Sequence, residues 1–130
     1  MPELFTSLRR AEIIIGVATN DYESVARNQL RSVNAENEVA FICGFDSGYG
    51  YKPDSGMIDA FCRQTSCDAE QVAMVGDSTH DLMAGHAAGV ALKVGVLTGP
   101  ASADDLQNHA DVVLDDISQL LPWLRNKALL

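Results

Sequence analysis

The stretch 72–90, VAMVGDSTHDLMAGHAAGV, decides the fold class and raises the question of function. An apolar run leads almost directly into Asp77, and a second carboxylate follows at Asp81. The pattern predicts a buried strand over 72–77 and a helix over 79–88. Two interpretations of the acids stay open: they cap the helix, or they hold a divalent cation.

The same alternation of apolar runs and helical stretches continues along the whole chain. The expected strands cover 13–20, 39–45, 72–77, 91–99 and 111–116. The expected helices cover 21–33, 57–66, 79–88 (ended by Gly89), 103–109 and 117–127. Strands that are apolar throughout are typical of sheets covered on both faces, and the helices supply the crossovers of parallel strands. We expect an α/β fold with an open, three-layer, mostly parallel (Rossmann-like) sheet, in a single domain spanning 1–130.

Length, composition and charge narrow the class of partner. A chain of 130 residues with 47% apolar and 21% charged residues has the size and composition of one globular domain. The formal net charge of −9 argues against nucleic acid or a membrane as partner, because either would require a basic patch. Three cysteines leave one unpaired under any scheme, and the N-terminus has no apolar signal core. We therefore expect a cytoplasmic protein with reduced thiols.

Ligands of open α/β sheets gather at the carboxyl ends of the strands, which directs attention to the residues that follow each strand. Asp77 stands at such an end, where a carboxylate is costly unless it is solvated, paired or bound to a metal. Oxygen ligands completed by water are the usual environment of Mg²⁺. Ser78 and Asp81 have the spacing of a capping box, so Asp81 taken alone favours a structural role.

Two further strand ends carry groups suited to phosphate. Thr19 places a hydroxyl beside the amides that open the next helix, although Thr19 or Asn20 as a plain N-cap is an equally open interpretation. Lys52 lies in a glycine-rich loop stiffened by Pro53, whereas a lone surface lysine is usually just solvated. A hydroxyl, an ammonium and two carboxylates at three strand ends indicate phosphoryl-transfer chemistry.

These residues stand in a familiar order. IIIGVATN (13–20), YGYKPDSGMI (49–58) and VAMVGDSTHDLMAGHAAGVALKVGVLTG (72–99) resemble the second, third and fourth motifs of the haloacid dehalogenase-like (HAD) hydrolase superfamily, in particular its phosphoglycolate-phosphatase-like branch. The resemblance implies a Mg²⁺-dependent phosphomonoesterase acting on a small phosphorylated metabolite. It assigns phosphate binding to Thr19, Asn20 and Lys52, catalysis to Lys52 and Asp77, direct metal ligation to Asp77, and action on the metal through water to Asp81.

The family's first motif, an aspartate nucleophile with a second aspartate two residues on, has no counterpart before Thr19. Asp46 follows a strand, but we reject it as the nucleophile because Ser47 and Gly48 follow it in a linking loop. Without a nucleophile the covalent step is missing, so we expect the isolated chain to be inactive. The cap domain of the family is absent as well, and the chain resembles the C-terminal half of such an enzyme.

By the same resemblance, the absent strand is the central one, between the strands that end at Thr19 and Asp77. Either another segment fills its place or those two strands pair directly, and both alternatives stay open. Because unpaired apolar edges promote association, we expect a homodimer.

Two other functional classes compete with an enzyme. A non-catalytic remnant that binds Mg²⁺ or phosphate, or serves as an interaction module, is the alternative. A receiver-like phospho-acceptor domain ranks last, because MPELFTSLRR offers no early pair of acids.

Overall fold

The computed structural model describes residues 2–129, and it confirms the α/β class and the mostly parallel sheet. The strands are β1 (Gly16–Ala18), β2 (Phe41–Cys43), β3 (Ala73–Gly76), β4 (Leu92–Val96) and β5 (Val112–Leu114). The helices are α1 (Pro2–Arg10), α2 (Glu23–Ser32), α3 (Gly56–Thr65), α4 (Thr79–Ala88), α5 (Ala103–Gln107) and α6 (Leu120–Asn126). Short 3-10 turns cover Glu36–Glu38, Ala69–Gln71 and Ile117–Gln119.

The strands form two separate parallel sheets. One sheet has the order β1-β2 and the other the order β3-β4-β5. Within residues 2–129, β1 and β3 are not paired with each other, and no third strand joins them. We call this interruption between β1 and β3 the sheet break. Neither alternative expected from the sequence occurs in the described chain, because each of these two strands has a partner on one side only.

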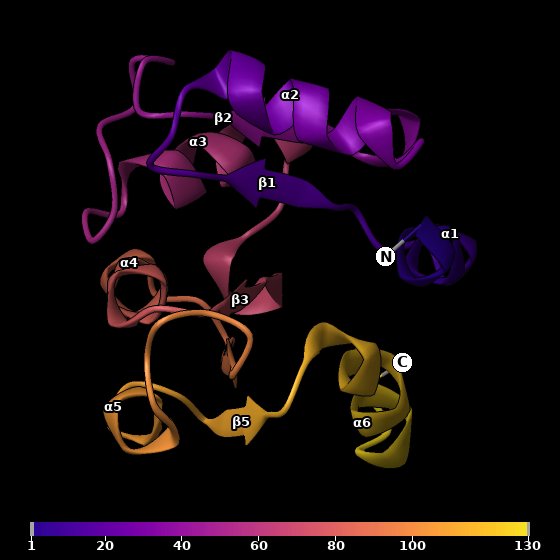
Figure 1. The fold of residues 1–130 in the computed structure, drawn as a ribbon, viewed down its shortest axis with the longest axis vertical. Coiled ribbons are helices and arrows are strands. Elements are labelled where there is room, and N and C mark those ends of the chain that lie inside the picture. The colour runs from indigo at the N-terminus through magenta and orange to yellow at the C-terminus, as the bar shows by residue number, and fades with distance from the viewer. Residues whose placement is uncertain (1, 130) are drawn as a thin grey trace.

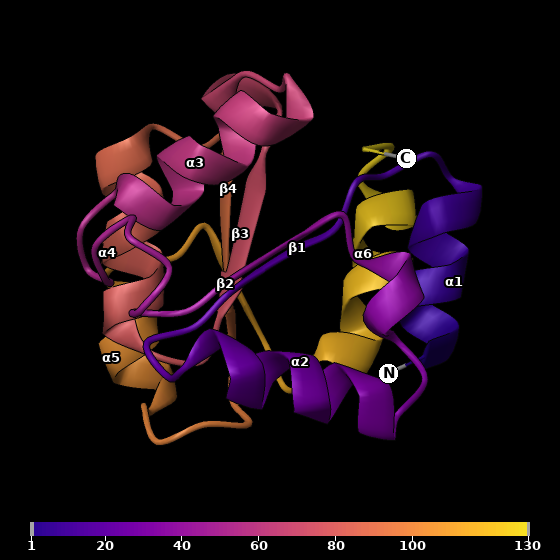
Figure 2. The ribbon, with the colours of Figure 1, turned by 90° about the horizontal axis from the view of Figure 1, so that it is seen from above.

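Helices lie on both sides of the strands. Figure 2 shows α3, α4 and α5 on one side and α1 and α6 on the other. Figure 1 shows β1 and β2 with α2 in one half of the molecule, and β3 and β5 with α4 and α5 in the other. The helices therefore hold the two sheets in one three-layer arrangement even though no strand connects them.

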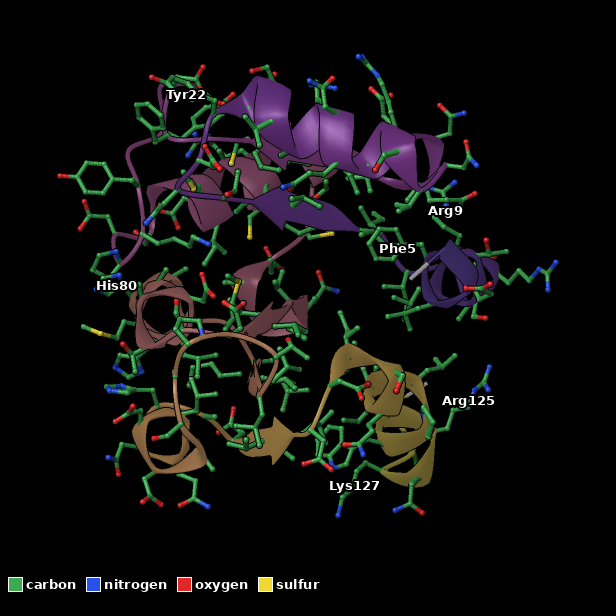
Figure 3. The ribbon with its side chains drawn as sticks, in the orientation of Figure 1. Phe5, Arg9, Tyr22, His80, Arg125 and Lys127 are labelled. Carbon is green, nitrogen blue, oxygen red and sulfur yellow. The ribbon has the colours of Figure 1, made fainter. Side chains whose placement is uncertain are left out.

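Apolar clusters join the halves on each side. On the first side, Ile58 of α3 packs with Ala84 of α4 and with Val90. On the second side, Phe5 of α1 belongs to a buried cluster against which Leu121 of α6 packs. Phe5 lies on the part of α1 that faces the strands, whereas Arg125 of α6 points away from them (Figure 3).

The strands are shorter than the sequence predicts. The apolar run at 13–20 forms hydrogen-bonded strand only over Gly16–Ala18, because it pairs only with the three residues of β2. Ile15, before the strand, is buried in the cluster with Phe5 and Leu8 of α1. The apolar run at 13–20 therefore includes residues that are buried without being part of a hydrogen-bonded strand.

The helix that follows β3 has the predicted bounds and ends. Ser78 is its N-cap, and Gly89 ends it in a left-handed conformation with φ of 79°. Among the helices of residues 2–129, none has the length and hydropathy needed to cross a bilayer.

Candidate active site

Lys52 lies at the centre of the candidate site. Its ammonium Nζ donates to the carbonyl oxygen of Ala18 at 2.9 Å and to Asp81 Oδ1 at 2.5 Å. The side chains of Lys52 and Asp81 are only 10% and 9% exposed, so water screens this ion pair poorly. Lys52 comes from the loop between β2 and α3, and Asp81 from the first turn of α4. The pair thus connects the two halves of the molecule.

Asn20 positions the lysine. Its side-chain amide donates to the carbonyl oxygen of Lys52 at 3.0 Å, and its Oδ1 accepts from the backbone N–H of Lys52 at 2.8 Å. The residue after β1 therefore fixes the backbone of a loop thirty-two residues further along the chain. Because the nitrogen and the oxygen of its side-chain amide are both hydrogen-bonded to Lys52, the role of Asn20 here is to hold Lys52 in position.

Asp81 uses both of its carboxylate oxygens. Oδ1 pairs with Lys52, while Oδ2 accepts from the backbone N–H of Asp77 at 3.1 Å and from that of Ser78 at 3.3 Å. The hydroxyl of Ser78 accepts from the backbone N–H of Asp81 at 3.3 Å, which completes the predicted capping box. The structural interpretation of Asp81 is therefore confirmed. Asp81 also forms an ion pair with Lys52, which the spacing of residues in the sequence does not predict.

Asp77 differs from Asp81 in having a free carboxylate. Among the hydrogen bonds and ion pairs of residues 2–129, none involves its side-chain oxygens, and the residue is half-buried. The carboxylate lies against Gly99, where a Cβ added to the glycine would come within 2.4 Å of Asp77 Cγ. A glycine after β4 thus makes room for the acid that follows β3.

Thr19 does not cap the helix that follows it. Its Oγ1 accepts from the backbone N–H of Asp21 at 3.1 Å, and α2 begins only at Glu23, with Tyr22 as an N-cap that makes no side-chain hydrogen bond. The interpretation of Thr19 or Asn20 as the N-cap of α2 is therefore wrong. The hydrogen of the Thr19 hydroxyl stays available to donate, as a phosphate oxygen would require.

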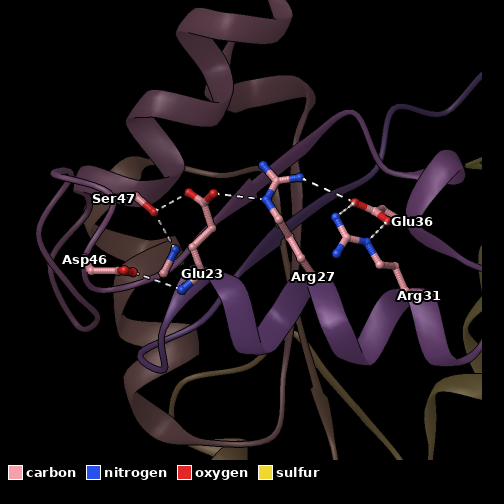
Figure 4. A network of polar contacts seen from close by, with 7 residues as sticks. Glu23, Arg27, Arg31, Glu36, Asp46 and Ser47 are labelled. Carbon is pink, nitrogen blue, oxygen red and sulfur yellow. Dashed lines mark hydrogen bonds and ion pairs between the residues drawn. The ribbon is translucent and has the colours of Figure 1, made fainter.

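A polar network that the sequence pattern does not predict lies beside the site. Asp46 accepts from the backbone N–H of Glu23 at 2.9 Å and so supplies the side-chain cap that α2 lacks (Figure 4). Ser47 donates its hydroxyl to Glu23 at 2.7 Å, and Arg27 donates to Glu23 at 3.0 Å. These two donors lower the pKa of Glu23, the serine hydrogen bond having the larger effect. Asp46 therefore has a structural role at the N-terminus of α2.

The network continues along α2 to Glu36, in the 3-10 turn that follows this helix. Glu36 receives Arg31 through two hydrogen bonds, of 2.6 and 3.2 Å, and lies 3.7 Å from Arg27 (Figure 4). In the sequence, this network could have been suspected from Asp46 in the loop after β2. A carboxylate in a loop can accept a hydrogen bond from the N-terminus of a neighbouring helix.

The donor set fits part of a Mg²⁺ site. Residues 2–129 contain no group of three or more His, Cys, Asp or Glu side chains arranged to hold a metal ion. Asp77 offers one free carboxylate, and Asp81 lies one helical turn away with its oxygens engaged. Mg²⁺ commonly takes one or two carboxylates and completes its shell with water and substrate phosphate, so Asp77 fits as one ligand of a site that needs others.

Two pockets lie away from these strand ends. One, of about 400 Å³, is bordered by Arg27, Glu36 and the start of β2. The other, of about 300 Å³, is bordered by His86, Lys93 and His109. Neither includes Thr19, Lys52 or Asp77, so the candidate site is an open edge of the sheet and not one of these pockets.

Comparison with known proteins identifies the family. Residues 1–94 match the model of the haloacid dehalogenase-like hydrolase family, and the chain belongs to that family. It is 31% identical over 125 residues to a phosphoglycolate phosphatase of Agrobacterium fabrum, covering 96% of this chain and 53% of that protein. It is 29% identical over 127 residues to an N-acetylmuramic acid 6-phosphate phosphatase of Pseudomonas aeruginosa, covering 95% of this chain and 55% of that protein.

The fold comparison agrees with the family. The crystal structure of a hydrolase from Pseudomonas syringae superposes with a TM-score of 0.85 at 22% identity, covering 95% of this chain and 57% of that one. The chain thus spans about half the length of the curated relatives it matches. The resemblance stated from the motifs is confirmed at the level of family and fold.

Proposed function

We propose that this chain carries the phosphate-binding and metal-binding half of a Mg²⁺-dependent phosphomonoesterase that acts on a small phosphorylated metabolite. The observation that carries the proposal is the convergence of Thr19, Lys52 and Asp77 at the carboxyl ends of β1, β2 and β3. The Lys52–Asp81 pair ties these ends together. Membership of a hydrolase family, with phosphatases among the relatives, supports the same class of reaction.

Each side chain has a defined role in this proposal. The Thr19 hydroxyl donates a hydrogen bond to an oxygen of the phosphoryl group. The ammonium of Lys52 has three N–H donors, of which Ala18 and Asp81 use two, so one remains to neutralise that group. Asn20 holds the lysine in place through its backbone.

The metal would be held by Asp77 directly and by Asp81 through water. When bound, Mg²⁺ supplies positive charge next to the phosphoryl oxygens. Asp81 also orients the Lys52 ammonium through the 2.5 Å contact. Asp77 is the better direct ligand because its carboxylate has no other partner within residues 2–129.

We also propose that the chain is inactive alone, because none of the acids in residues 2–129 has the position of the family's nucleophile. The relatives' names specify different phosphorylated compounds, so the metabolite is not assigned more finely.

Calorimetric titration with Mg²⁺ tests the metal assignment. We expect Asp77→Asn to weaken binding at least tenfold, while Asp104→Asn, an exposed acid at the start of α5, leaves it unchanged. Equal binding by the Asp77→Asn protein and the wild type would refute the assignment.

Turnover of para-nitrophenyl phosphate tests the proposal that the isolated chain is inactive. We expect no Mg²⁺-dependent hydrolysis above background by the isolated chain. Robust hydrolysis that Lys52→Ala abolishes would show that a nucleophile is present after all. Binding of Mg²⁺ without turnover is also the behaviour of a non-catalytic module, and restored turnover with the rest of the enzyme would exclude that alternative.

A further inference from the structure

The turn that ends α3 brings two cysteines together. Ser66 follows the helix in the left-handed conformation, with φ of 58° and ψ of 35°. The backbone N–H of Cys67 then donates to the carbonyl oxygen of Cys62 at 3.1 Å. A hydrogen bond of this spacing around a left-handed residue defines a Schellman motif, whose first and last side chains frequently contact each other. Cys62 and Cys67 occupy these two positions.

The same hydrogen bond limits the separation of the two backbones. With standard bond lengths on either side of it, the Cα atoms of Cys62 and Cys67 are at most about 7 Å apart. Disulfides usually span Cα separations of roughly 4.4–6.8 Å. The Sγ of Cys67 lies 3.7 Å from the carbonyl oxygen of Thr65, at the end of α3, so this side chain is directed back toward the helix that carries Cys62. A disulfide between the two residues therefore requires at most a small movement.

The surroundings of the two thiols also suit a bond between them. Both residues are half-buried, so a small molecule can reach them. Cys62 packs against the apolar cluster that joins α3 to α4. Burial raises the pKa of the Cys62 thiol, and the neighbouring Asp59, Cys67 and Asp68 raise it further. A disulfide carries no charge, so it fits this apolar and acidic environment better than a thiolate does.

Cys43, in β2, provides a contrast within the same chain. It is 0% exposed, and burial raises the pKa of its thiol to about 11. A buried thiol of this kind is inert toward oxidants in the folded protein. Of the three cysteines in the sequence, two are therefore accessible neighbours and the third is protected.

We propose that Cys62 and Cys67 are a site of reversible disulfide formation at the end of α3, oxidised by small organic disulfides. In reducing surroundings both thiols stay free, as expected from the sequence, and the cross-link forms when the oxidised partner is in excess. This inference concerns the end of α3 and does not depend on the proposed reaction.

The exchange takes place in two steps. The thiolate of Cys67 attacks one sulfur of the oxidant, so that a mixed disulfide forms, the S–S bond of the oxidant breaks and its other sulfur leaves as a thiolate. The thiolate of Cys62 then attacks the Sγ of Cys67 and releases the second sulfur of the oxidant. The protein is oxidised by the loss of two hydrogens, and the oxidant is reduced to two thiols, whose sulfurs take up the two protons. Cys67 attacks first because the raised pKa of Cys62 leaves less of that residue as thiolate.

Equilibration with mercaptoethanol and its disulfide tests the site. This oxidant is uncharged, so Asp59 and Asp68 do not repel it. After an acid quench, the remaining thiols of the unfolded chain are blocked with N-ethylmaleimide and counted by mass spectrometry. We expect three blocked thiols in reducing mixtures and one in oxidising mixtures, without added mercaptoethanol.

Peptide mapping then locates the bond. Arg63 lies between the two cysteines, so trypsin leaves their fragments joined only if the disulfide is present. Pro53 protects the bond after Lys52 from trypsin, which keeps Cys43 on the same fragment as Cys62. The mapping is therefore repeated with Cys43→Ala, and we expect the same joined fragments.

Two further comparisons separate a built site from two accessible thiols. We expect the equilibrium constant for oxidation to be at least about threefold larger in the folded chain than in guanidinium chloride, because the motif holds the cysteines together only in the folded state. We expect Cys62→Ser to stop at the mixed disulfide on Cys67, since the second attacking thiol is absent.

Three outcomes would overturn the proposal. The first is that oxidising mixtures leave three thiols to be blocked, or add mercaptoethanol to both cysteines without joining them. The second is that the disulfide involves Cys43 or links two chains. The third is an equilibrium constant that is the same in the folded and unfolded chain, which would reduce the motif to an apolar contact.

Discussion

Strand β4 and strand β1 show what a neighbour on each side contributes. β4 pairs with β3 and β5 and spans five residues, of which Val94 and Val96 are 0% and 6% exposed. β1 pairs only with β2 and spans three, and all three are exposed or half-buried. The run at 13–20 that contains β1 has no charged residue, whereas β4 contains Lys93. Strand length in this protein therefore follows the number of neighbours: β4 has two and spans five residues, whereas the strands with one neighbour span three or four.

The Lys52–Asp81 bridge between the halves gives the largest expected effect. Lys52→Met leaves Asp81 buried without its counter-charge, and we expect a loss of about 3 kcal/mol in the free energy of unfolding, measured with urea. Lys93→Met is the matched control, because Lys93 pairs at 3.7 Å with an Asp111 side chain that is 48% exposed, and we expect a loss of less than about 1 kcal/mol. Equal losses would mean that the bridge does not hold the two sheets together.

Truncation of one valine in each sheet tests the comparison directly. Val94→Ala removes two methyl groups from a fully buried position of β4, and we expect a cost of about 2 kcal/mol. Val17→Ala, in β1, should cost less than about 1 kcal/mol because water already reaches the residue. A larger loss at Val17 than at Val94 in urea unfolding would contradict the difference in burial.

The capping box of α4 gives a smaller effect. Ser78→Ala removes the acceptor for the backbone N–H of Asp81, and we expect a loss of about 1 kcal/mol in the free energy of unfolding. Ser102→Ala removes the equivalent cap from α5, which has only five residues, and should cost several tenths of a kcal/mol. If the two variants lose the same stability, the cap at Ser78 does not support the bridge through Asp81.

The smallest effect concerns pH and the β1-β2 half. Ser47 and Arg27 lower the pKa of Glu23 below its ordinary value of 4.5 in the folded protein. The stabilisation is therefore complete above the unfolded pKa and is lost as the pH falls through the folded pKa. We expect Glu23→Gln to be slightly less stable than the wild type at pH 7, and we expect this difference to shrink as the pH falls below 4.5. A difference in urea midpoint that does not shrink with falling pH would assign the effect to packing.

Much of the candidate site could be predicted from sequence because it depends on local patterns. The acids at 77 and 81 follow an apolar run, and Ser78 has the spacing of a cap, so the capping box was predictable within one helical turn. The contact of Lys52 with Asp81 joins residues 29 apart, and the contact of Asn20 with Lys52 joins residues 32 apart. No local pattern encodes which of several acids a lysine reaches.

The sequence by itself determined the α/β class, the alternation of strands and helices, the cap of α4 and the motifs that place the chain in its family. These features depend on periodicity and on spacing within one element. Only the tertiary structure decided that the sheet is split, that Asp46 caps α2, and that Lys52 and Asp81 bridge the two halves. Such features depend on which polar groups find hydrogen-bond partners across the fold. Those partners come from segments that are distant in the chain, so local sequence patterns do not reveal them.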